Sequence, residues 1–260
     1  MTIAPLKPVS PATEPCKICA TPAPLFGVVD FGKSCEEFSG KVFPLTGVPV
    51  YYRRCPQCGF VFTTAFDAWS PQQFKDHIYN DDYVTYDPGY VEARPTTIAG
   101  MIARTFAGEK ARLRVLDYGG GNGVFAERLR AAGFLAAETY DPFSPRFAAM
   151  PEGRFDIVTS FEMLEHHPDP HAGISALGGC LGDPGVIVFS TLVQPADFEK
   201  QRLGWWYAGP RNGHISLFSR RALAFAWQRA GFSLVSFNDN YHAAYRQLPD
   251  FARHLVKAAA

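Results

Sequence analysis

The sequence predicts an α/β protein with a doubly wound sheet, preceded by a small module that contains cysteines. Apolar runs at 115–118, 134–140, 155–161 and 185–192 alternate with stretches of helical character, which is the pattern of parallel strands joined by crossovers. A glycine-rich turn follows the first run, and two closely spaced cysteine pairs lie near the N-terminus. These three observations predict the fold class and also mark the two places where function is expected.

The composition is that of a globular protein with one large and one small domain. The chain has 260 residues, 47% of them hydrophobic, and a formal net charge of zero. Neutral charge without a basic stripe argues against a nucleic-acid partner, and no run approaches the ~20 apolar residues that span a membrane. The first fifteen residues hold no signal peptide, so we expect a cytoplasmic protein. The expected divisions are a disordered 1–15, a cysteine module at 16–66, a helical, tyrosine-rich bridge and lid at 67–110, and the α/β domain at 111–260.

The turn after the first strand has the features of a ligand cradle. An acid ends the strand, and glycines follow at every second position. Glycine lets the backbone turn sharply and lets a ligand lie against the main chain. The stretch 124–133 reads as a helix with a glycine stop, so its N-terminus points at the ligand. The predicted cofactor-binding residues of this turn are Asp117, Gly119, Gly121, Asn122 and Gly123.

Two cofactors compete for this cradle. Gly121, Gly123 and Ala126 also match the dinucleotide fingerprint, but Asp117 would repel a pyrophosphate. S-adenosylmethionine instead brings an ammonium and a sulfonium, which suit an acid, and its carboxylate suits a helix N-terminus. The string from Asp117 to Gly123 resembles the first motif of class I methyltransferases. This resemblance implies a Rossmann-like, S-adenosylmethionine-binding methyltransferase domain over 111–260.

A second acid, Asp141, ends the next strand, about 20 residues past the glycines, where it is placed to hold ribose hydroxyls. The alternative is a loop acid before a proline. Only the stretch 142–154 separates it from the following strand, and a helical crossover needs at least ~10–12 residues. We therefore expect a truncated unit here. Adenine recognition stays unassigned, with Phe143 and Met150 as candidates.

The strand 155–161 runs into a segment with two acids and a histidine. The segment resembles the post-strand motif of quinone-biosynthesis and other small-molecule methyltransferases. The resemblance implies that Phe161 and Glu162 lie beside the cofactor and that Glu165 and His166 face the pocket. In some O-methyltransferases with this motif the acids and the histidine bind Mg²⁺, as these ligand types permit. Metal-free relatives share the same string.

The cysteine pairs predict a zinc ribbon. Two C-x-x-C pairs are the usual tetrathiolate arrangement, and four thiolates close the coordination sphere, so the zinc is expected to be structural. Disulfides are disfavoured because cytosolic thiols stay reduced, and a redox dithiol would leave one pair unexplained. Cys35 and Cys180 are expected to be small apolar residues. The predicted zinc ligands are Cys16, Cys19, Cys55 and Cys58.

The bridge contains a segment, 79–90, that is dense in tyrosine. It is either a packed linker or a lid whose hydroxyls reach the cofactor or the acceptor. Zinc-ribbon methyltransferases resemble this chain in having such a segment before the cofactor domain. On the lid interpretation, Tyr83 and Tyr86 are predicted to bind the cofactor.

The remaining elements follow from periodicity, caps and stops. Helices are expected at 71–79, 96–107, 171–181 and 219–230, and a closing antiparallel hairpin at 232–237 and 243–248.

The segment 204–218 follows the last parallel strand, and loops at the carboxyl ends of such strands carry ligand sites. Its aromatic residues offer flat faces for an acceptor, and its histidine suits a general base, although a structural hydrogen bond would also explain it. The end of the segment resembles that of zinc-ribbon sugar and glycan methyltransferases. His214 is the predicted base and His166 the second choice; the predicted acceptor-binding residues are Glu165, Trp205, Trp206, Tyr207 and Arg211.

Together these features predict S-adenosylmethionine-dependent methyl transfer to a small-molecule acceptor, with a sugar, nucleotide-sugar or glycan precursor as the first choice. A Mg²⁺-assisted O-methyltransferase acting on a phenol or quinone precursor is the alternative enzyme. A non-catalytic cofactor-binding module, which would use the ribbon to dock a partner, is the alternative outside catalysis. The oligomeric state stays open.

Overall fold

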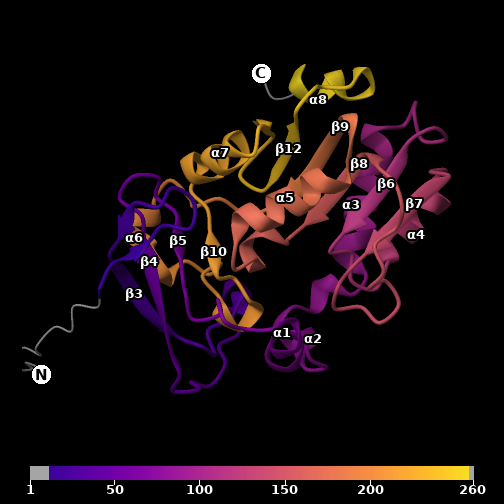
Figure 1. Ribbon diagram of the computed structural model, residues 1–260. Helices are drawn as coiled ribbons and strands as arrows, with labels where there is room; N and C mark the ends of the chain where they lie inside the picture. The colour runs from indigo at the N-terminus through magenta and orange to yellow at the C-terminus, as the bar shows by residue number, and fades with distance from the viewer. Residues whose placement is uncertain (1–11, 258–260) are drawn as a thin grey trace, which may run out of the picture.

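The computed structural model describes residues 12–257 and is built around a six-stranded sheet with the order β11-β12-β9-β8-β6-β7 (Figure 1). Strands β7, β6, β8 and β9 are parallel to one another, and β12 and β11 close the sheet as an antiparallel hairpin. The predicted doubly wound α/β fold is confirmed. The strands are β6 (Arg114–Tyr118), β7 (Ala136–Tyr140), β8 (Phe155–Phe161), β9 (Leu181–Ser190), β11 (Ser233–Ser236) and β12 (Tyr241–Tyr245).

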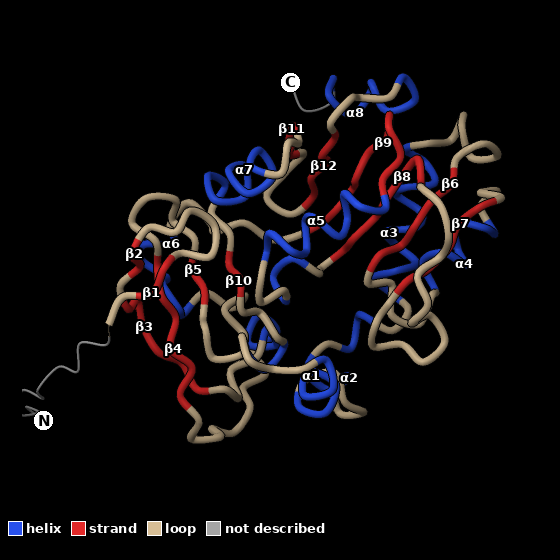
Figure 2. Tube along the Cα trace, in the orientation of Figure 1, coloured by secondary structure: helices blue, strands red, loops and turns tan. Residues whose placement is uncertain are grey.

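Helices cover both faces of this sheet (Figure 2). Because successive strand residues point to opposite faces, Val115 packs with the cluster on one side and Leu116 with the cluster on the other. Helices α3, α4 and α8 supply the first cluster, and α5 and α7 supply the second. Their bounds are α3 (Ala93–Thr105), α4 (Val124–Ala131), α5 (Pro170–Cys180), α7 (Arg220–Arg229) and α8 (Arg253–Lys257).

The connection between β7 and β8 lacks the helix and strand of a full crossover unit, as the sequence analysis predicts. Residues 141–154 form neither helix nor strand, and β7 is the edge of the sheet. The carboxyl ends of β6 and β7 are therefore covered on this side by a loop instead of a further strand.

The segment 16–66 forms three strands of a four-stranded sheet, and a later segment of the chain supplies the fourth. The strand order of this sheet is β10-β5-β4-β3, and β10 comes from the segment after β9. The described part of the predicted disordered tail already contributes β1, while residues 1–11 lie outside the described residues. The strands are β1 (Glu14–Pro15), β2 (Pro22–Ala23), β3 (Leu25–Asp30), β4 (Pro49–Arg54), β5 (Val61–Phe62) and β10 (Ser216–Leu217).

Short helices join the module to the large sheet. Helix α1 begins with a capping box, in which the side chains of Ser70 and Gln73 bond each other's backbone N–H groups. The short helices are α1 (Pro71–His77), α2 (Tyr83–Tyr86) and α6 (Phe198–Gln201), with 3-10 turns η1 (Cys35–Ser39), η2 (Pro88–Tyr90), η3 (Leu164–His166), η4 (Arg202–Gly204), η5 (Pro210–Asn212) and η6 (Asp250–Ala252). Over residues 12–257, every helix is too short or too polar to cross a membrane.

Candidate functional site

The glycine turn lies at the carboxyl end of β6, and its backbone requires glycine. Gly119, Gly121 and Gly123 have φ values of 78°, 57° and 82°, a region that other residues rarely adopt. Gly120 is required for a different reason, because a Cβ there would lie 2.0 Å from Asp117 Oδ2. The glycines thus place no side chains between Asp117 and a ligand that lies against the main chain of the turn.

Asp117 is buried beneath this turn. Its Oδ1 accepts a hydrogen bond of 3.3 Å from the Thr159 hydroxyl, whereas Oδ2 finds no partner among the described residues. Burial raises the pKa of the carboxyl to about 7. Burial makes the negative charge of the Asp117 carboxylate unfavourable, and Oδ2 has no hydrogen-bond partner to offset it. A cation bound beside Oδ2 would stabilise the charged form.

Asp141 and Asn122 hold the turn in place. The Asp141 carboxylate accepts from the Gly121 N–H and from the Phe143 N–H, each at 2.8 Å. The Asn122 amide donates to the carbonyl of Val91 at 2.8 Å. Both side chains therefore fix the loop geometry, whatever further contact they make with a cofactor.

A residue that the sequence analysis missed covers this site. The Phe147 ring lies 2.6 Å from where a Cβ on Gly123 would be, so it rests on the turn. Of the two adenine candidates, Phe143 packs against Tyr79 and Met150 lies 3.9 Å from the Cys180 sulfur at the end of α5. Met150 is thus far from the turn. No local pattern distinguishes Phe147 from other loop phenylalanines.

Phe161 and Glu162 stand at the end of β8. The Phe161 ring packs on Phe125 of α4. Glu162 has a φ of 53° and its carboxylate pairs with Arg94 at 2.5 Å, while Arg94 also binds Asp87 at 2.7 Å. This ion-pair chain clamps the tyrosine segment to the end of the strand. The sequence analysis missed Arg94, because a single arginine in a helix carries no signal of its partners.

The tyrosines predicted to bind the cofactor contact a different loop in this structure. Tyr83 is buried, and its hydroxyl donates to the Asn212 carbonyl at 3.4 Å. The Tyr86 ring lies 3.7 Å below the Arg211 guanidinium. The observed contacts are thus with η5, on the acceptor side.

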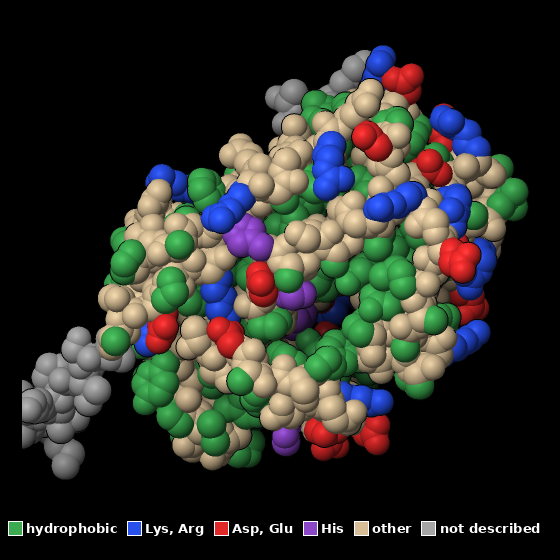
Figure 3. All heavy atoms as spheres, in the orientation of Figure 1, with side chains coloured by type: hydrophobic (Ala, Val, Ile, Leu, Met, Phe, Trp, Pro, Cys, Tyr) green, Lys and Arg blue, Asp and Glu red, His purple; other side chains and the backbone are tan. Residues whose placement is uncertain are grey.

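A buried cluster forms where η3 meets the segment that follows η5. The side chains of Glu165, His166 and His214 bring a carboxylate oxygen and two imidazole nitrogens within 4.8 Å of one another. Burial raises the pKa of Glu165 to about 7, lowers that of His166 to about 4, and lowers that of His214 well below its usual value. The face shown in Figure 3 is hollowed near its centre, with histidine side chains in the hollow.

Tyr207 supports two members of this cluster at once. Its hydroxyl donates to Glu165 Oε1, and its backbone carbonyl accepts from His214 Nδ1 at 2.9 Å. Cys35, which was expected to be only a small apolar residue, instead places its sulfur 3.4 Å from the same His214 nitrogen. The site therefore includes a side chain from the N-terminal module.

The other predicted acceptor residues divide into buried and partly accessible ones. Trp205 is only 3% exposed and packs against Phe198 and Tyr207, so it belongs to the core in this structure. Trp206 is partly exposed and packs on Phe38. Arg211 is 7% exposed and donates to the Ile78 carbonyl.

The four cysteines of the two C-x-x-C pairs converge as predicted. Sulfur–sulfur distances of 3.6, 3.4 and 3.7 Å join Cys16 to Cys58, Cys19 to Cys55 and Cys19 to Cys58. Thiolates on one zinc ion at 2.3 Å would lie about 3.8 Å apart. The N–H groups of Ile18 and Cys58 point at sulfurs, each at 3.4 Å. The cluster fits a tetrahedral zinc site.

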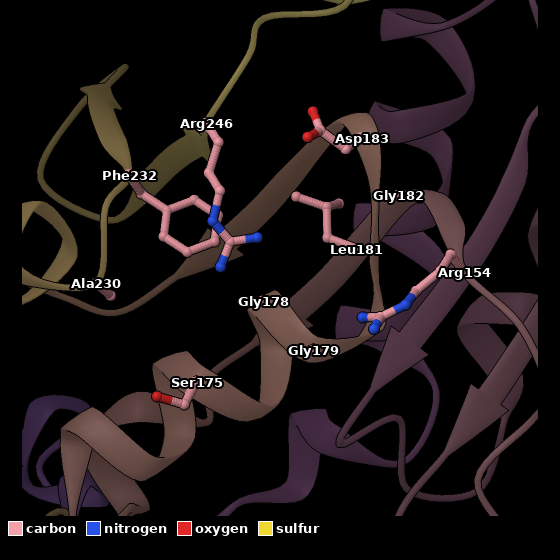
Figure 4. A pocket seen from close by; sticks show the side chains of 10 residues that line it. All are labelled: Arg154, Ser175, Gly178, Gly179, Leu181, Gly182, Asp183, Ala230, Phe232 and Arg246. Carbon is pink, nitrogen blue, oxygen red and sulfur yellow. The ribbon is translucent and has the colours of Figure 1, made fainter.

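An open cavity of about 560 Å³ lies elsewhere, between the end of α5 and the start of β9. Arg154 and Arg246 approach it from opposite sides (Figure 4). Because β6 and β9 run in the same direction as β8, this cavity is at the end of the sheet opposite the glycine turn and is not part of the site described above.

Comparisons with known proteins agree with this geometry. A family model described as a methyltransferase domain matches residues 90–237. The ubiquinone biosynthesis O-methyltransferase of Aromatoleum aromaticum is 34% identical over 102 residues, which are 30% of this chain and 44% of that protein. The enzyme of the same name from Xanthomonas axonopodis pv. citri is 31% identical over 169 residues, 53% of this chain and 70% of that protein.

The chain thus spans less than half the length of the Aromatoleum relative. Among solved structures, an O-methyltransferase family protein from Burkholderia thailandensis has a TM-score of 0.52 at 16% identity and covers 70% of this chain and 64% of its own. The family match favours the methyltransferase interpretation of the glycine turn over the dinucleotide one. The chain belongs to the methyltransferase domain family, and its fold is that of a class I methyltransferase.

Proposed function

We propose that this enzyme transfers the methyl group of S-adenosylmethionine to a hydroxyl oxygen of an aromatic acceptor of the phenol or quinone-precursor class. The observation that carries the proposal is the buried cluster of Glu165, His166 and His214 at the carboxyl end of β8. The names of the relatives favour this acceptor class over the sugar class that the C-terminal motif predicts.

The cofactor is proposed to bind over the glycine turn. The backbone of the glycine turn around Gly121 and the N-terminus of α4 receive the methionine carboxylate. The free oxygen of Asp117 attracts the ammonium group. Asp141 keeps lone pairs for the ribose hydroxyls while it holds the turn. Phe161 and Glu162 then border the sulfonium side.

The acceptor is proposed to enter beside the cluster, because β8 is the direct neighbour of β6 and both strands end at the same edge. Methyl transfer is an in-line displacement, and holding donor and acceptor in line contributes several kcal/mol, on the order of 7–11 at best. A hydroxyl must lose its proton to attack well. The cluster that includes His166 and His214 provides buried basic atoms for that loss.

The four cysteines are proposed to hold a structural Zn²⁺. Their sulfurs occupy every position of a tetrahedron, so this ion has no open position for chemistry. The ion would stabilise the N-terminal module, so that its strand β5 keeps its pairing with β10. The residue range 16–66 is therefore proposed as a ribbon that depends on the large domain for its last strand.

The test is transfer of labelled methyl from S-adenosylmethionine to two acceptor panels, hydroxylated benzoates and phenols on one side and nucleotide sugars on the other. We expect label on a phenolic oxygen. Label only on sugars would overturn the proposed acceptor class. Tight cofactor binding with no transfer to either panel, or to pooled small-molecule extract, would support the non-catalytic module instead.

A matched pair of variants separates binding from transfer. His214→Gln is expected to lower kcat at least tenfold while the affinity for S-adenosylhomocysteine stays within twofold, because His214 is placed on the acceptor side. The exposed His77 serves as the control, and His77→Gln should leave both quantities unchanged. Equal kcat values for the two variants would remove His214 from the mechanism.

A further inference from the structure

The cavity at the start of β9 has the size of a small-molecule site. Its volume of about 560 Å³ falls in the range of about 300–1,000 Å³ that such sites occupy. Four segments line it, namely the loop before β8, the second half of α5, the start of β9 and the residues that flank the β11–β12 hairpin. Neither the glycine turn nor the buried cluster contributes a residue to the lining, so the methyl-transfer site proposed above leaves this cavity without a role.

Arg154 and Arg246 bring two positive charges to this cavity. Their guanidinium groups extend into it from opposite sides (Figure 4). Over residues 12–257, neither group has a carboxylate within the ion-pairing distance of 4.0 Å. Arg114, at the same end of the sheet, is by contrast paired with Glu138 at 3.2 Å. The two cavity arginines therefore keep their charges available for a ligand.

The acid in the lining, Asp183, does not neutralise this pair. Asp183 is exposed, and its carboxylate points away from the Arg154 guanidinium (Figure 4). The end of α5 adds a partial negative charge, which for a helix C-terminus is about half a unit. The two full charges of Arg154 and Arg246 exceed these contributions together, so the cavity favours an anion.

Arg246 is held in place without the use of its hydrogen-bond donors. Its Cζ lies over the Phe232 ring, 4.2 Å from the ring centre. A guanidinium carries its N–H donors in its own plane, so a ring against its face leaves the donors at the edge available. Gly178 makes room for this pair, because a Cβ there would lie 2.9 Å from Phe232 Cζ and 3.0 Å from Arg246 Nη2. The donors of Arg246 are thus positioned before any ligand arrives.

The wall that α5 forms is open to close approach. A Cβ on Gly179 would meet nothing within 4 Å, so the main chain faces open space there. Ser175 is one turn earlier on the same face of the helix and also lines the cavity. A hydroxyl and an uncovered backbone therefore lie beside the two arginines.

We propose that this cavity binds a phosphate-bearing small molecule between Arg154 and Arg246. A phosphate group presents oxygens in several directions, so guanidinium groups on opposite sides can both bind it, whereas a carboxylate presents a single planar edge. One phosphate group fills only part of the cavity, which favours a phosphate ester or a diphosphate. Strand β8 has seven residues, so roughly 20 Å of strand separates this site from the glycine turn. The ligand is therefore distinct from the cofactor and the methyl acceptor.

The first test follows backbone amide signals by NMR in the full-length protein labelled with ¹⁵N-glycine. Pyrophosphate, glycerol 3-phosphate, inorganic phosphate and succinate are titrated separately at low ionic strength. We expect the signals of Gly178, Gly179 and Gly182 to move and saturate with the phosphates, while those of Gly119 and Gly121 in the glycine turn stay in place. Saturation at the lowest concentration by inorganic phosphate would support the phosphate class with the free ion as its source. Equal or tighter binding of succinate would overturn the phosphate class.

The second test compares variants by calorimetric titration with pyrophosphate. Arg154→Gln and Arg246→Gln should each weaken binding about tenfold or more, because each removes a charge-assisted pair. Arg246→Lys keeps the charge but loses the planar fork, and should also weaken binding. Arg221→Gln is the matched control, since it removes an exposed charge from α7 outside the cavity, and should bind like the wild type.

The same binding constant for the three glutamine variants would show that the anion binds without a site and would overturn the proposal. Shifts confined to the glycine turn, or no shift with any phosphate, would overturn it as well. Because both arginines are exposed, the variants should keep the fold of the wild type. The NMR titration uses the unmodified protein, so it decides the question even if one variant failed to fold.

Discussion

The hydroxyl of Tyr52 donates a hydrogen bond of 2.7 Å to the backbone carbonyl of His214. Tyr52 belongs to β4 of the N-terminal module and is fully buried, whereas His214 belongs to the segment after β9. Two residues on, Ser216 pairs with Phe62 of β5, and the Ile215 N–H donates to the Glu165 carbonyl at 2.9 Å. The N-terminal module thus packs directly against the segment that carries His214 of the buried cluster.

Tyr52→Phe should destabilise the protein by about 1–3 kcal/mol, because it leaves a buried carbonyl without its donor. Chemical denaturation measures this change. Tyr51 is the matched control, since it is on the same strand and 51% exposed, and Tyr51→Phe should have no effect. Equal midpoints for the two variants would mean that the bond contributes nothing.

Gly120→Ala should weaken both folding and cofactor binding. The added Cβ would overlap Asp117 Oδ2 and approach Thr139 Cγ2 to 2.7 Å, and overpacking of this kind costs about 1–3 kcal/mol. Thermal denaturation and calorimetric titration with S-adenosylhomocysteine measure the two effects. A Cβ on Gly179 of α5 meets nothing within 4 Å, so Gly179→Ala should be neutral or slightly stabilising.

The affinity for S-adenosylhomocysteine should depend on pH through Asp117. Its folded pKa of about 7 means that the carboxyl is mostly neutral at pH 6 and mostly charged at pH 8. If only the charged form attracts the ammonium group, affinity rises about tenfold over this range. Asp117→Asn should remove the dependence, while Asp183→Asn, an exposed change at the other end of the sheet, should keep it.

The raised pKa of Asp117 also affects the free energy of unfolding, which should fall over the pH range in which cofactor affinity rises. Because the folded pKa of Asp117 lies above the ordinary aspartate value of 3.8, the folded state keeps the proton to a higher pH than the unfolded state does. Its stabilising contribution is complete below the unfolded pKa and is lost as pH rises through about 7. Asp117→Asn should therefore gain stability relative to the wild type between pH 4 and 8 in denaturant titrations. A constant difference across this range would show that Asp117 titrates normally.

Cys58→Ser should release the zinc of the module and lower the thermal midpoint. A closed tetrathiolate contributes folding free energy directly, and the Cys58 carbonyl also accepts from Ser219 at the start of α7. Native mass spectrometry reports the metal loss. Cys180→Ser, a change at a partly exposed thiol outside the cluster, should keep both the metal and the midpoint. A Cys58→Ser protein that retains its zinc would rule out this ligand set.

The local parts of this molecule could be predicted from the sequence. The alternation of apolar strands and helices, the glycine turn after Asp117, the acid at 141 and the short connection that follows are all encoded by neighbouring residues. The hairpin β11–β12 and the helix capped by Ser219 were predicted for the same reason. Backbone preference, caps and periodicity act over a few residues, so a single segment carries the whole signal.

The tertiary structure alone decided which distant residues meet. The pairing of β10 with β5, the ion pair between Arg94 and Glu162, and the burial of Trp205 all join segments that are far apart in the sequence. Cys35 gave no local sign of its contact with His214. Such contacts depend on packing between separate segments, because side chains meet only after burial has brought their backbones together. Residue types thus determined the cofactor class, and packing determined the buried cluster at the acceptor side.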